Sequence, residues 1–284
     1  MSQRIAHLQL HCAALLVGVS ALFGESLNVS ASMIVLGRAA FALLALSMIC
    51  LCLNLRPWRG ISGGTIARLL TTGVALGGHW ILFFLAVKTG GVAVATLGFA
   101  SFPAFTALLE RLLFGQRLGR SDRLILLLVS AGLVLVTPSF DLRDGATEGL
   151  LWGVLSGASY AAIAVANKHV SSKVDGLSSC WWQCLAISVA LLPWCLWELP
   201  AIGRHDWWQL AALGVLCTAL AYSLFIASLR HVHTHTAAVV IAMEPIYAIA
   251  GAWLLFGSVP SVGMVLGGLL ILGAVAWAGL KSKT

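Results

Sequence analysis

The residue best placed for chemistry in this sequence is a single carboxylate inside an apolar stretch. Glu244 is the only acidic residue well within the segment from Thr236 to Phe256, which is otherwise apolar and long enough to form a helix. A charge at that depth in a bilayer costs several kcal/mol unless it faces a polar cavity or a partner, so such a group is a candidate functional residue. Pro245 follows it directly, removes one backbone N–H and frees the carbonyl of Ile241. We therefore predict a ligand-binding role for Glu244 beside a hinge at Pro245.

Two further ionisable residues lie deep in apolar segments. His79 follows a pair of glycines near the middle of its segment. It either hydrogen-bonds to a neighbouring helix or lines a cavity, where it can bind a substrate and titrate in the physiological range. Arg38 is the deepest basic residue. It either extends to the outer interface or binds Glu25 or an anion. Both residues are candidates for substrate binding.

Three histidines alternate with other residues at His231, His233 and His235. Imidazole is a good ligand for transition metals, but structural metal sites usually add cysteine or further spaced ligands. None accompanies this segment, so the sequence predicts a polar, basic loop and no metal site, while metal binding by the three histidines stays open.

The segments that must position these residues are strongly apolar. Of the 284 residues 60% are apolar and 10% are charged, whereas soluble domains have about 25% charged residues. A helix crosses a bilayer with about 20 mostly apolar residues. The sequence therefore predicts an all-α integral membrane protein of ten transmembrane helices. We place them at roughly residues 9–28, 33–53, 67–87, 91–114, 123–140, 148–168, 178–198, 208–229, 236–256 and 261–280.

The positive charge is concentrated on one side of this predicted bundle. Alternate loops hold 13 of the 17 Lys and Arg residues, and the opposite loops hold most of the acidic ones. Cytoplasmic loops are enriched in Lys and Arg, so both termini should be cytoplasmic and the number of spans even. The net charge of +7 then reflects topology, and no nucleic-acid partner is expected. We predict a multi-pass protein of a cell inner membrane, surrounded by the lipid bilayer.

An internal repeat relates the two halves of the chain. A shift of 142 residues places Pro103 on Pro245 and needs no gap from residue 79 to residue 136. Each copy, residues 1–140 and 146–284, should hold five helices. An odd number inserts the second copy from the opposite side of the membrane, as in many secondary transporters. Pro103 is therefore predicted as a second hinge.

Four more residues are binding candidates, from their places in this repeat or from their depth in a segment. Trp80 aligns with Tyr222, and Tyr160 lies at mid-depth in its own segment. Ser101 lies in the segment that mirrors the Glu244 helix. Phe102 occupies the position of Glu244 itself, so the predicted site is asymmetric across the repeat.

The two copies share a recognisable pattern. It reads Pro103-Ala-Phe-Thr-Ala-Leu-Leu-Glu-Arg-Leu-Leu-Phe-Gly-Gln-Arg-Leu in the first copy and Glu244-Pro245-Ile-Tyr-Ala-Ile-Ala-Gly-Ala-Trp-Leu-Leu-Phe-Gly in the second. With this pattern the chain resembles the EamA-type ten-helix exporters of the drug/metabolite transporter (DMT) superfamily. That family usually has Gly-Glu after this helix, whereas Gln116 and Ser258 follow the glycines here. The resemblance implies two inverted five-helix bundles around a central cavity.

The resemblance also implies a secondary exporter of small polar metabolites, amino acids among them, that works by alternating access. Protons are one coupling ion to consider, and downhill efflux is the other energy source, because the ATP-binding pattern Gly-x-x-x-x-Gly-Lys-Ser/Thr is absent. The alternative class is an intramembrane enzyme acting on a lipid-linked substrate, but such enzymes need several acids to hold Mg²⁺. Within transporters, the alternative is a nucleotide-sugar or drug carrier. We expect no enzyme activity and no cofactor, in a monomer or homodimer.

Overall fold

The computed structural model describes residues 3–115, 119–137, 139, 141, 143–167, 174–229, 231–232 and 234–281. All of the regular structure in these residues is helical, which confirms the all-α prediction for them. Six of their helical segments are long and apolar enough to cross a membrane. The helices are α1 (Gln3–Ser26), α2 (Ala31–Cys52), α3 (Gly63–Phe99), α4 (Phe102–Phe114), α5 (Arg120–Val136), α6 (Gly145–Asn167), α7 (Gly176–Cys195), the short 3₁₀-helix η1 (Leu199–Ala201), α8 (Arg204–Gly214), the π-helix η2 (Val215–Leu220), α9 (Ala221–Leu229), α10 (Thr234–Ile241), α11 (Glu244–Phe256) and α12 (Val262–Lys281).

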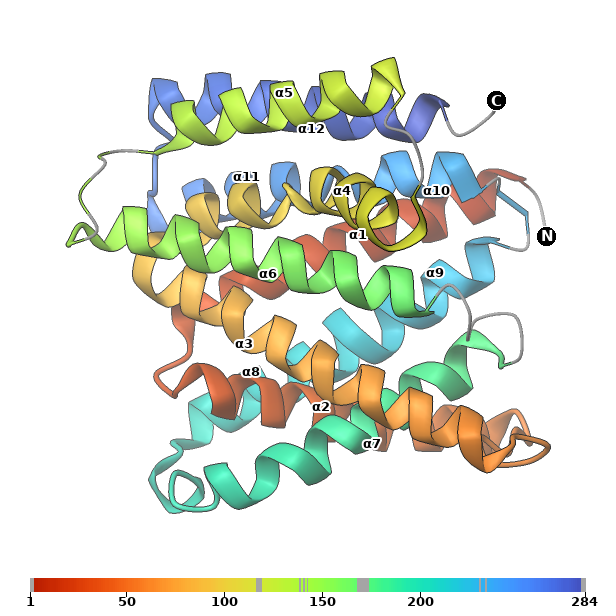
Figure 1. Ribbon diagram of the computed structural model, residues 1–284. Coiled ribbons are helices and arrows are strands. Elements are labelled where there is room, and N and C mark those ends of the chain that lie inside the picture. The colour runs from red at the N-terminus through yellow and green to blue at the C-terminus, as the bar shows by residue number, and fades with distance from the viewer. Residues whose placement is uncertain are drawn as a thin grey trace.

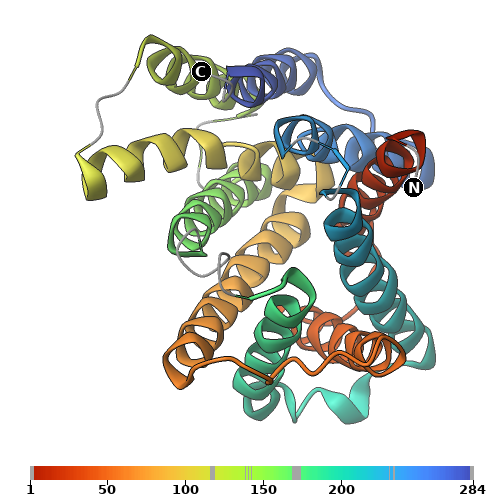
Figure 2. The same cartoon turned by 90° about the vertical axis from the view of Figure 1, so that its right-hand side faces the viewer.

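The helices form one bundle in which α1 begins and α12 ends at the same end (Figure 1). Helices α5 and α12 pack side by side along one edge of it (Figures 1 and 2). Their contact is tight because Gly132 of α5 faces Gly267 of α12, and a Cβ on Gly267 would lie 2.5 Å from the Gly132 carbonyl oxygen. Small residues at such crossings let apolar helices approach closely in a membrane.

Helix α3 reverses direction at Gly91. This residue has φ 79° and ψ 169°, a combination that glycine adopts without steric cost. Before it, α3 runs antiparallel to α6, since Thr72 and Ala166 line one cavity and Gly90 lies against Gly149. After it, residues 92–99 run parallel to α6. The two pieces of α3 correspond to parts of two separate segments expected from hydropathy.

Both segments predicted to contain a proline hinge are broken in the structure. The first, expected at 91–114, divides into the end of α3 and α4, with Pro103 in the first turn of α4. The second, expected at 236–256, divides into α10 and α11, with Pro245 in the first turn of α11. Proline is tolerated at this position because the first-turn N–H has no intrahelical acceptor. Each break therefore lies beside the proline that was predicted to weaken the segment, Pro103 or Pro245.

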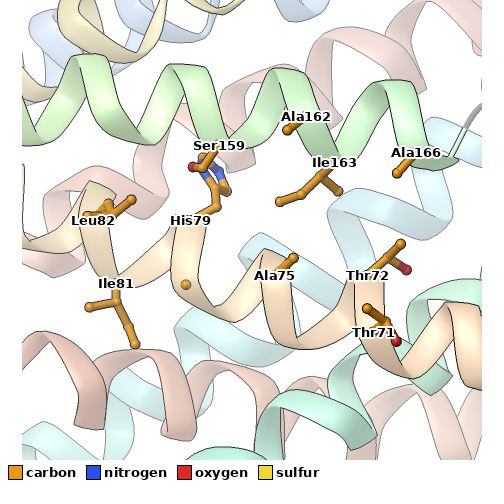
Figure 3. A pocket seen from close by; sticks show the side chains of 11 residues that line it. Thr71, Thr72, Ala75, His79, Ile81, Leu82, Ser159, Ala162, Ile163 and Ala166 are labelled. Atoms are coloured by element: carbon orange, nitrogen blue, oxygen red, sulfur yellow. The ribbon is translucent and has the colours of Figure 1, made fainter. Parts of the chain in front are cut away.

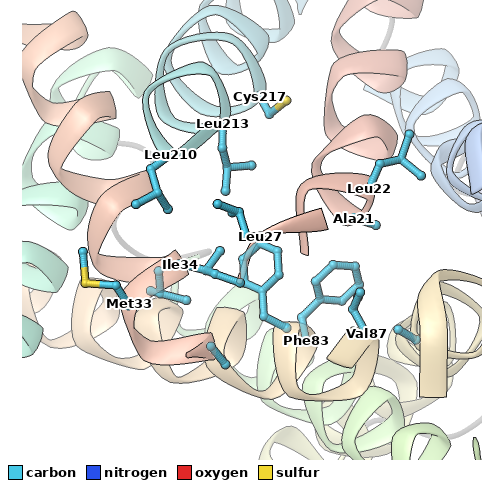
Figure 4. Close-up of a cluster of buried hydrophobic side chains, with 14 of the residues drawn as sticks. Ala21, Leu22, Leu27, Met33, Ile34, Phe83, Val87, Leu210, Leu213 and Cys217 are labelled. Carbon is cyan, nitrogen blue, oxygen red and sulfur yellow. The ribbon is translucent and has the colours of Figure 1, made fainter. Parts of the chain in front are cut away.

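The largest apolar core lies where α1, α2, α3 and α8 meet. Helices α2 and α8 approach closely, since a Cβ on Gly37 would lie 2.8 Å from a methyl group of Leu210. The side chains labelled in Figure 4 show this core between the helices: Ala21, Leu22, Leu27, Met33, Ile34, Phe83, Val87, Leu210, Leu213 and Cys217.

The contact between α3 and α6 depends on paired glycines, which allows a test of the packing. Gly149→Ala should lower the free energy of unfolding by about 1–3 kcal/mol through overpacking, because its new methyl group would lie 2.4 Å from the Gly90 Cα. Gly273→Ala is the control, since nothing lies within 4 Å of a Cβ there. Thermal unfolding in detergent compares the two. Equal midpoints would show that the helices can separate without cost.

Candidate functional site

Arg38 of α2 lies in the interior of the bundle. Its side chain is 6% exposed and does not extend to the outer interface. Its Nε donates a hydrogen bond of 2.8 Å to Thr218 Oγ1, and its guanidinium carbon lies 4.0 Å from the ring centroid of Trp80. A desolvated cation over a tryptophan face is stabilised by the ring quadrupole. Glu25, the other partner considered for Arg38, interacts instead with Lys88.

Glu244 lies at the start of α11, where the broken helix resumes. The carboxylate is close to a helix N-terminus, whose partial positive charge favours an anion. Its backbone packs against α1, since a Cβ on Gly18 would lie 2.8 Å from the Glu244 carbonyl oxygen. The residue is 9% exposed, so its side chain is largely removed from solvent.

The charges of Glu244 and Arg38 act on each other within this interior. Yet neither a hydrogen bond nor an ion pair joins them within the described part of the chain. Glu244 has no hydrogen-bond partner there either. A buried carboxylate normally has one. The structure thus holds the two side chains apart, and the carboxyl group of Glu244 keeps a small exposed fraction.

His79 of α3 hydrogen-bonds to a neighbouring helix, which is one of the two roles that the sequence left open. Its Nδ1 lies 3.0 Å from the carbonyl oxygen and 2.9 Å from the hydroxyl oxygen of Ser156 in α6. This is a helix–helix hydrogen bond. The ring also packs against Phe99 and Tyr160, with centroids 5.3 and 5.2 Å away. His79 furthermore lines a cavity.

Tyr160 connects this aromatic group with the charged residues. Its ring packs edge-on against Phe99 and Phe102, with centroids 5.5 and 5.4 Å away. Its hydroxyl lies within electrostatic range of Glu244 and of Tyr222. Direct contacts thus join Arg38 to Trp80 and His79 to Tyr160. Electrostatic interactions relate Glu244 to Arg38 and Tyr160, and Tyr222 to Tyr160.

Ser101 makes a different kind of contact from the other candidates, because it bonds to the backbone of its own segment. It is fully buried, and its hydroxyl donates to the Gly98 carbonyl over 2.7 Å. That bond satisfies an acceptor at the end of α3, next to the break before α4. The geometry gives Ser101 a part in the helix break, and its donor is already used.

One cavity lined by described residues lies between α3 and α6. Its volume is about 680 Å³. Of the candidates it includes His79 alone, and Glu244 is not part of its wall. Figure 3 shows the side chains that line it, which are Thr71, Thr72, Ala75, Gly78, His79, Ile81, Leu82, Ser159, Ala162, Ile163 and Ala166.

Two residues of the site were not found from the sequence. Thr218, the partner of Arg38, lies in the π-helical turn η2 (Val215–Leu220), and such turns occur frequently at functional sites. Ser156, the partner of His79, lies in α6. The one available signal was that both are small hydroxyl residues in apolar helices, where they serve as hydrogen-bond partners between helices.

The histidine segment lies only partly in the described chain. His231 is exposed, whereas His233 and the side chain of His235 fall outside the described residues. Among the residues that are described, no group of three or more His, Cys, Asp or Glu is arranged to hold a metal ion.

Known proteins resemble this chain over most of its length. The model of the EamA-like transporter family matches residues 4–137 and again residues 147–280. An uncharacterized transporter of Archaeoglobus fulgidus is 29% identical over 268 residues, 93% of each chain. The pseudopaline exporter CntI of Pseudomonas aeruginosa is 26% identical over 212 residues, 72% of each chain. A crystal structure with 19% identity has a TM-score of 0.68 and covers 98% of both chains, which shows a shared fold.

Proposed function

Because the chain belongs to the EamA-like transporter family, we propose that it is a secondary exporter of small polar metabolites, specifically amino acids and amino-acid-like compounds. The observation that carries this proposal is that Arg38 and Glu244 are both buried and feel each other's charge, while no ion pair or hydrogen bond joins them among the described residues. An amino acid carries a carboxylate and an ammonium group. Arg38 binds the carboxylate, for which the guanidinium fork is suited, and Glu244 binds the ammonium group or a proton.

The aromatic residues form the rest of the proposed site. Trp80 already holds Arg38 in place, and Tyr160 lies within electrostatic range of Glu244. His79 and Tyr222 complete the wall, and Ser101 contributes through the helix break that it stabilises. A site of this kind fixes the charged ends of a substrate and accepts varied side chains against its rings.

We assign the architecture to two inverted five-helix units, residues 1–140 and 146–284, with ten spans in total. Helix bounds support this assignment, because they recur after a shift of 142 residues. Helices α1 and α6 begin at Gln3 and Gly145, and α4 and α11 have 13 residues each. Helices α1 and α6 also run in opposite directions across the bundle (Figure 1).

Transport then proceeds by alternating access, with the breaks at Pro103 and Pro245 as the hinges. Broken helices at corresponding places of two repeats are typical binding and moving elements of secondary transporters. The charge distribution supports cytoplasmic termini in a cell inner membrane, and a relative named as a pseudopaline exporter supports export. Proton exchange or downhill efflux supplies the energy, in a monomer or a homodimer.

Polar contacts close the end of the bundle opposite to the start of α1. The turn between α1 and α2 is held by Glu198, which accepts hydrogen bonds from the Ser30 hydroxyl over 2.7 Å and the Ser30 amide over 3.3 Å. The Asn28 amide donates to Asp206 over 3.3 Å, and Lys88 donates to the Leu27 carbonyl. We assign these contacts to the outer gate in its closed state.

Glu198→Ala should open this gate. Two hydrogen bonds worth about 1 kcal/mol each are lost, which should speed hydrogen exchange at the Ser30 amide by roughly fivefold or more. Exchange followed by mass spectrometry measures it. Asp175→Ala removes an acidic helix cap elsewhere, since Asp175 accepts from the Ser178 amide, and should leave Ser30 unchanged. Equal exchange at the Ser30 amide in both variants would show that Glu198 does not hold the gate closed.

The medium of cells with and without the protein provides the main test of function. Amino acids or amino-acid-like compounds should accumulate outside cells that carry it, and the same compounds should cross proteoliposome membranes. Accumulation of nucleotide sugars or apolar drugs alone would replace this proposal with the alternative carrier. A product formed from a lipid-linked substrate would replace it with an enzyme.

A further inference from the structure

The cavity between α3 and α6 is a wedge that opens away from the candidate site. The two helices touch through Gly90 and Gly149, where a Cβ on Gly149 would lie 2.4 Å from the Gly90 Cα. They separate toward Thr71 and Ala166, which line the cavity. A Cβ on Gly78, inside the wedge, would meet nothing within 4 Å. The wedge is therefore open space between diverging helices.

The wedge lies on the face of α3 opposite to the charged interior. Residues in an α-helix advance by about 100° each, so Gly78 and Trp80 point in nearly opposite directions. Trp80 faces Arg38, whereas Gly78, Ala75 and Ala162 are exposed and line the wedge. Both walls belong to helices that qualify as membrane spans. The mouth of the wedge thus opens toward the lipid.

The wall of the wedge is mostly hydrocarbon, and each of its hydroxyl groups already donates a hydrogen bond to a backbone carbonyl. Thr71 donates to the Ala67 carbonyl, and Thr72 to that of Leu69. Ser159 donates to the Ser156 carbonyl, and the Nδ1 of His79 is occupied by Ser156. The remaining lining residues are alanine, glycine, isoleucine and leucine. Water or a polar metabolite would find few partners here.

We propose that this wedge is a binding site for one hydrocarbon chain of a bilayer lipid. Its volume of about 680 Å³ is within the range of ligand-binding pockets, about 300–1,000 Å³. The chain enters from the bilayer along Ala75 and Ala162 and ends near His79, where the helices converge. The site requires only that the protein spans a membrane, so its test does not depend on which substrate is transported.

A photoreactive lipid tests the site directly. The protein is reconstituted with phosphatidylethanolamine or phosphatidylglycerol that carries a diazirine in the middle of one acyl chain, then illuminated, extracted into detergent and mapped by mass spectrometry. Labels should concentrate at residues 71–82 and 159–166 with both headgroups. Labelling no stronger than at Leu44 and Met48, which are exposed on α2, or labelling with one headgroup only, would overturn the proposal.

Two matched variants separate occupancy of the wedge from general contact with lipid. Ala162→Phe places a ring inside the wedge and should reduce labelling there by about tenfold through steric exclusion. Ala164→Phe makes the same change on an exposed position of α6 that is not part of the wall, and should leave labelling unchanged. If Ala162→Phe fails to fold, Ala75→Phe fills the wedge from α3. Equal labelling of the filled and control variants would contradict the site.

Discussion

Replacing Glu244 with glutamine should reduce transport of an amino-acid-like substrate by roughly 30-fold or more, the cost of truncating one partner of a buried charged contact. Glutamine keeps the shape of the side chain but carries no negative charge and takes up no proton. Initial rates in proteoliposomes measure the loss. If protons drive export, the dependence of the rate on pH should disappear with it.

Glu148→Gln is the matched control for this experiment. Glu148 is an exposed carboxylate in the first turn of α6 and accepts a hydrogen bond from Trp152 Nε1, which a glutamine oxygen can also accept. Its loss of charge leaves the interior unchanged, so transport should remain at the wild-type level. A Glu244→Gln protein with wild-type rates and pH dependence would place the binding of substrate elsewhere in the bundle.

The break beside Glu244 could be predicted from the sequence because proline acts locally. Pro245 has no N–H to donate to the Ile241 carbonyl, and the structure ends α10 at Ile241 and begins α11 at Glu244. The helical class was predictable for a similar reason, since an apolar segment in a bilayer must satisfy its own backbone hydrogen bonds. In both cases the cause lies within a few residues of its effect.

The partners of the buried charges could not be predicted, because they depend on how distant segments pack. Thr218 lies 180 positions from Arg38, in a π-helical turn that no local pattern marked. For His79, only the position of Ser156 on α6 showed the hydrogen bond between the two helices, and its role in binding a substrate stays a prediction. The cavity between α3 and α6 could not be predicted either, because it arises from the way these two helices diverge from Gly90 and Gly149.

Replacing Arg38 with methionine should abolish transport and also destabilise the protein by about 1–3 kcal/mol, because Glu244 would remain in the interior without a compensating charge. The substitution also removes the hydrogen bond to Thr218 and the cation over Trp80. Arg38→Lys separates these effects. It keeps the positive charge but loses the planar fork and its stacking, so stability should be largely kept while transport falls. Unfolding in detergent and rates in proteoliposomes give the two readouts.

The double variant Arg38→Met with Glu244→Gln tests whether the two charges form one site. Their fields act on each other through a low-dielectric interior, so the second substitution should restore part of the stability lost in the first, with a coupling energy of about 0.5–3 kcal/mol. Transport should stay absent, because neither end of a zwitterion would find its counter-charge. Strictly additive losses of stability would mean that the charges act independently. Recovery of transport together with stability would mean that the charges hold the fold and do not bind the substrate.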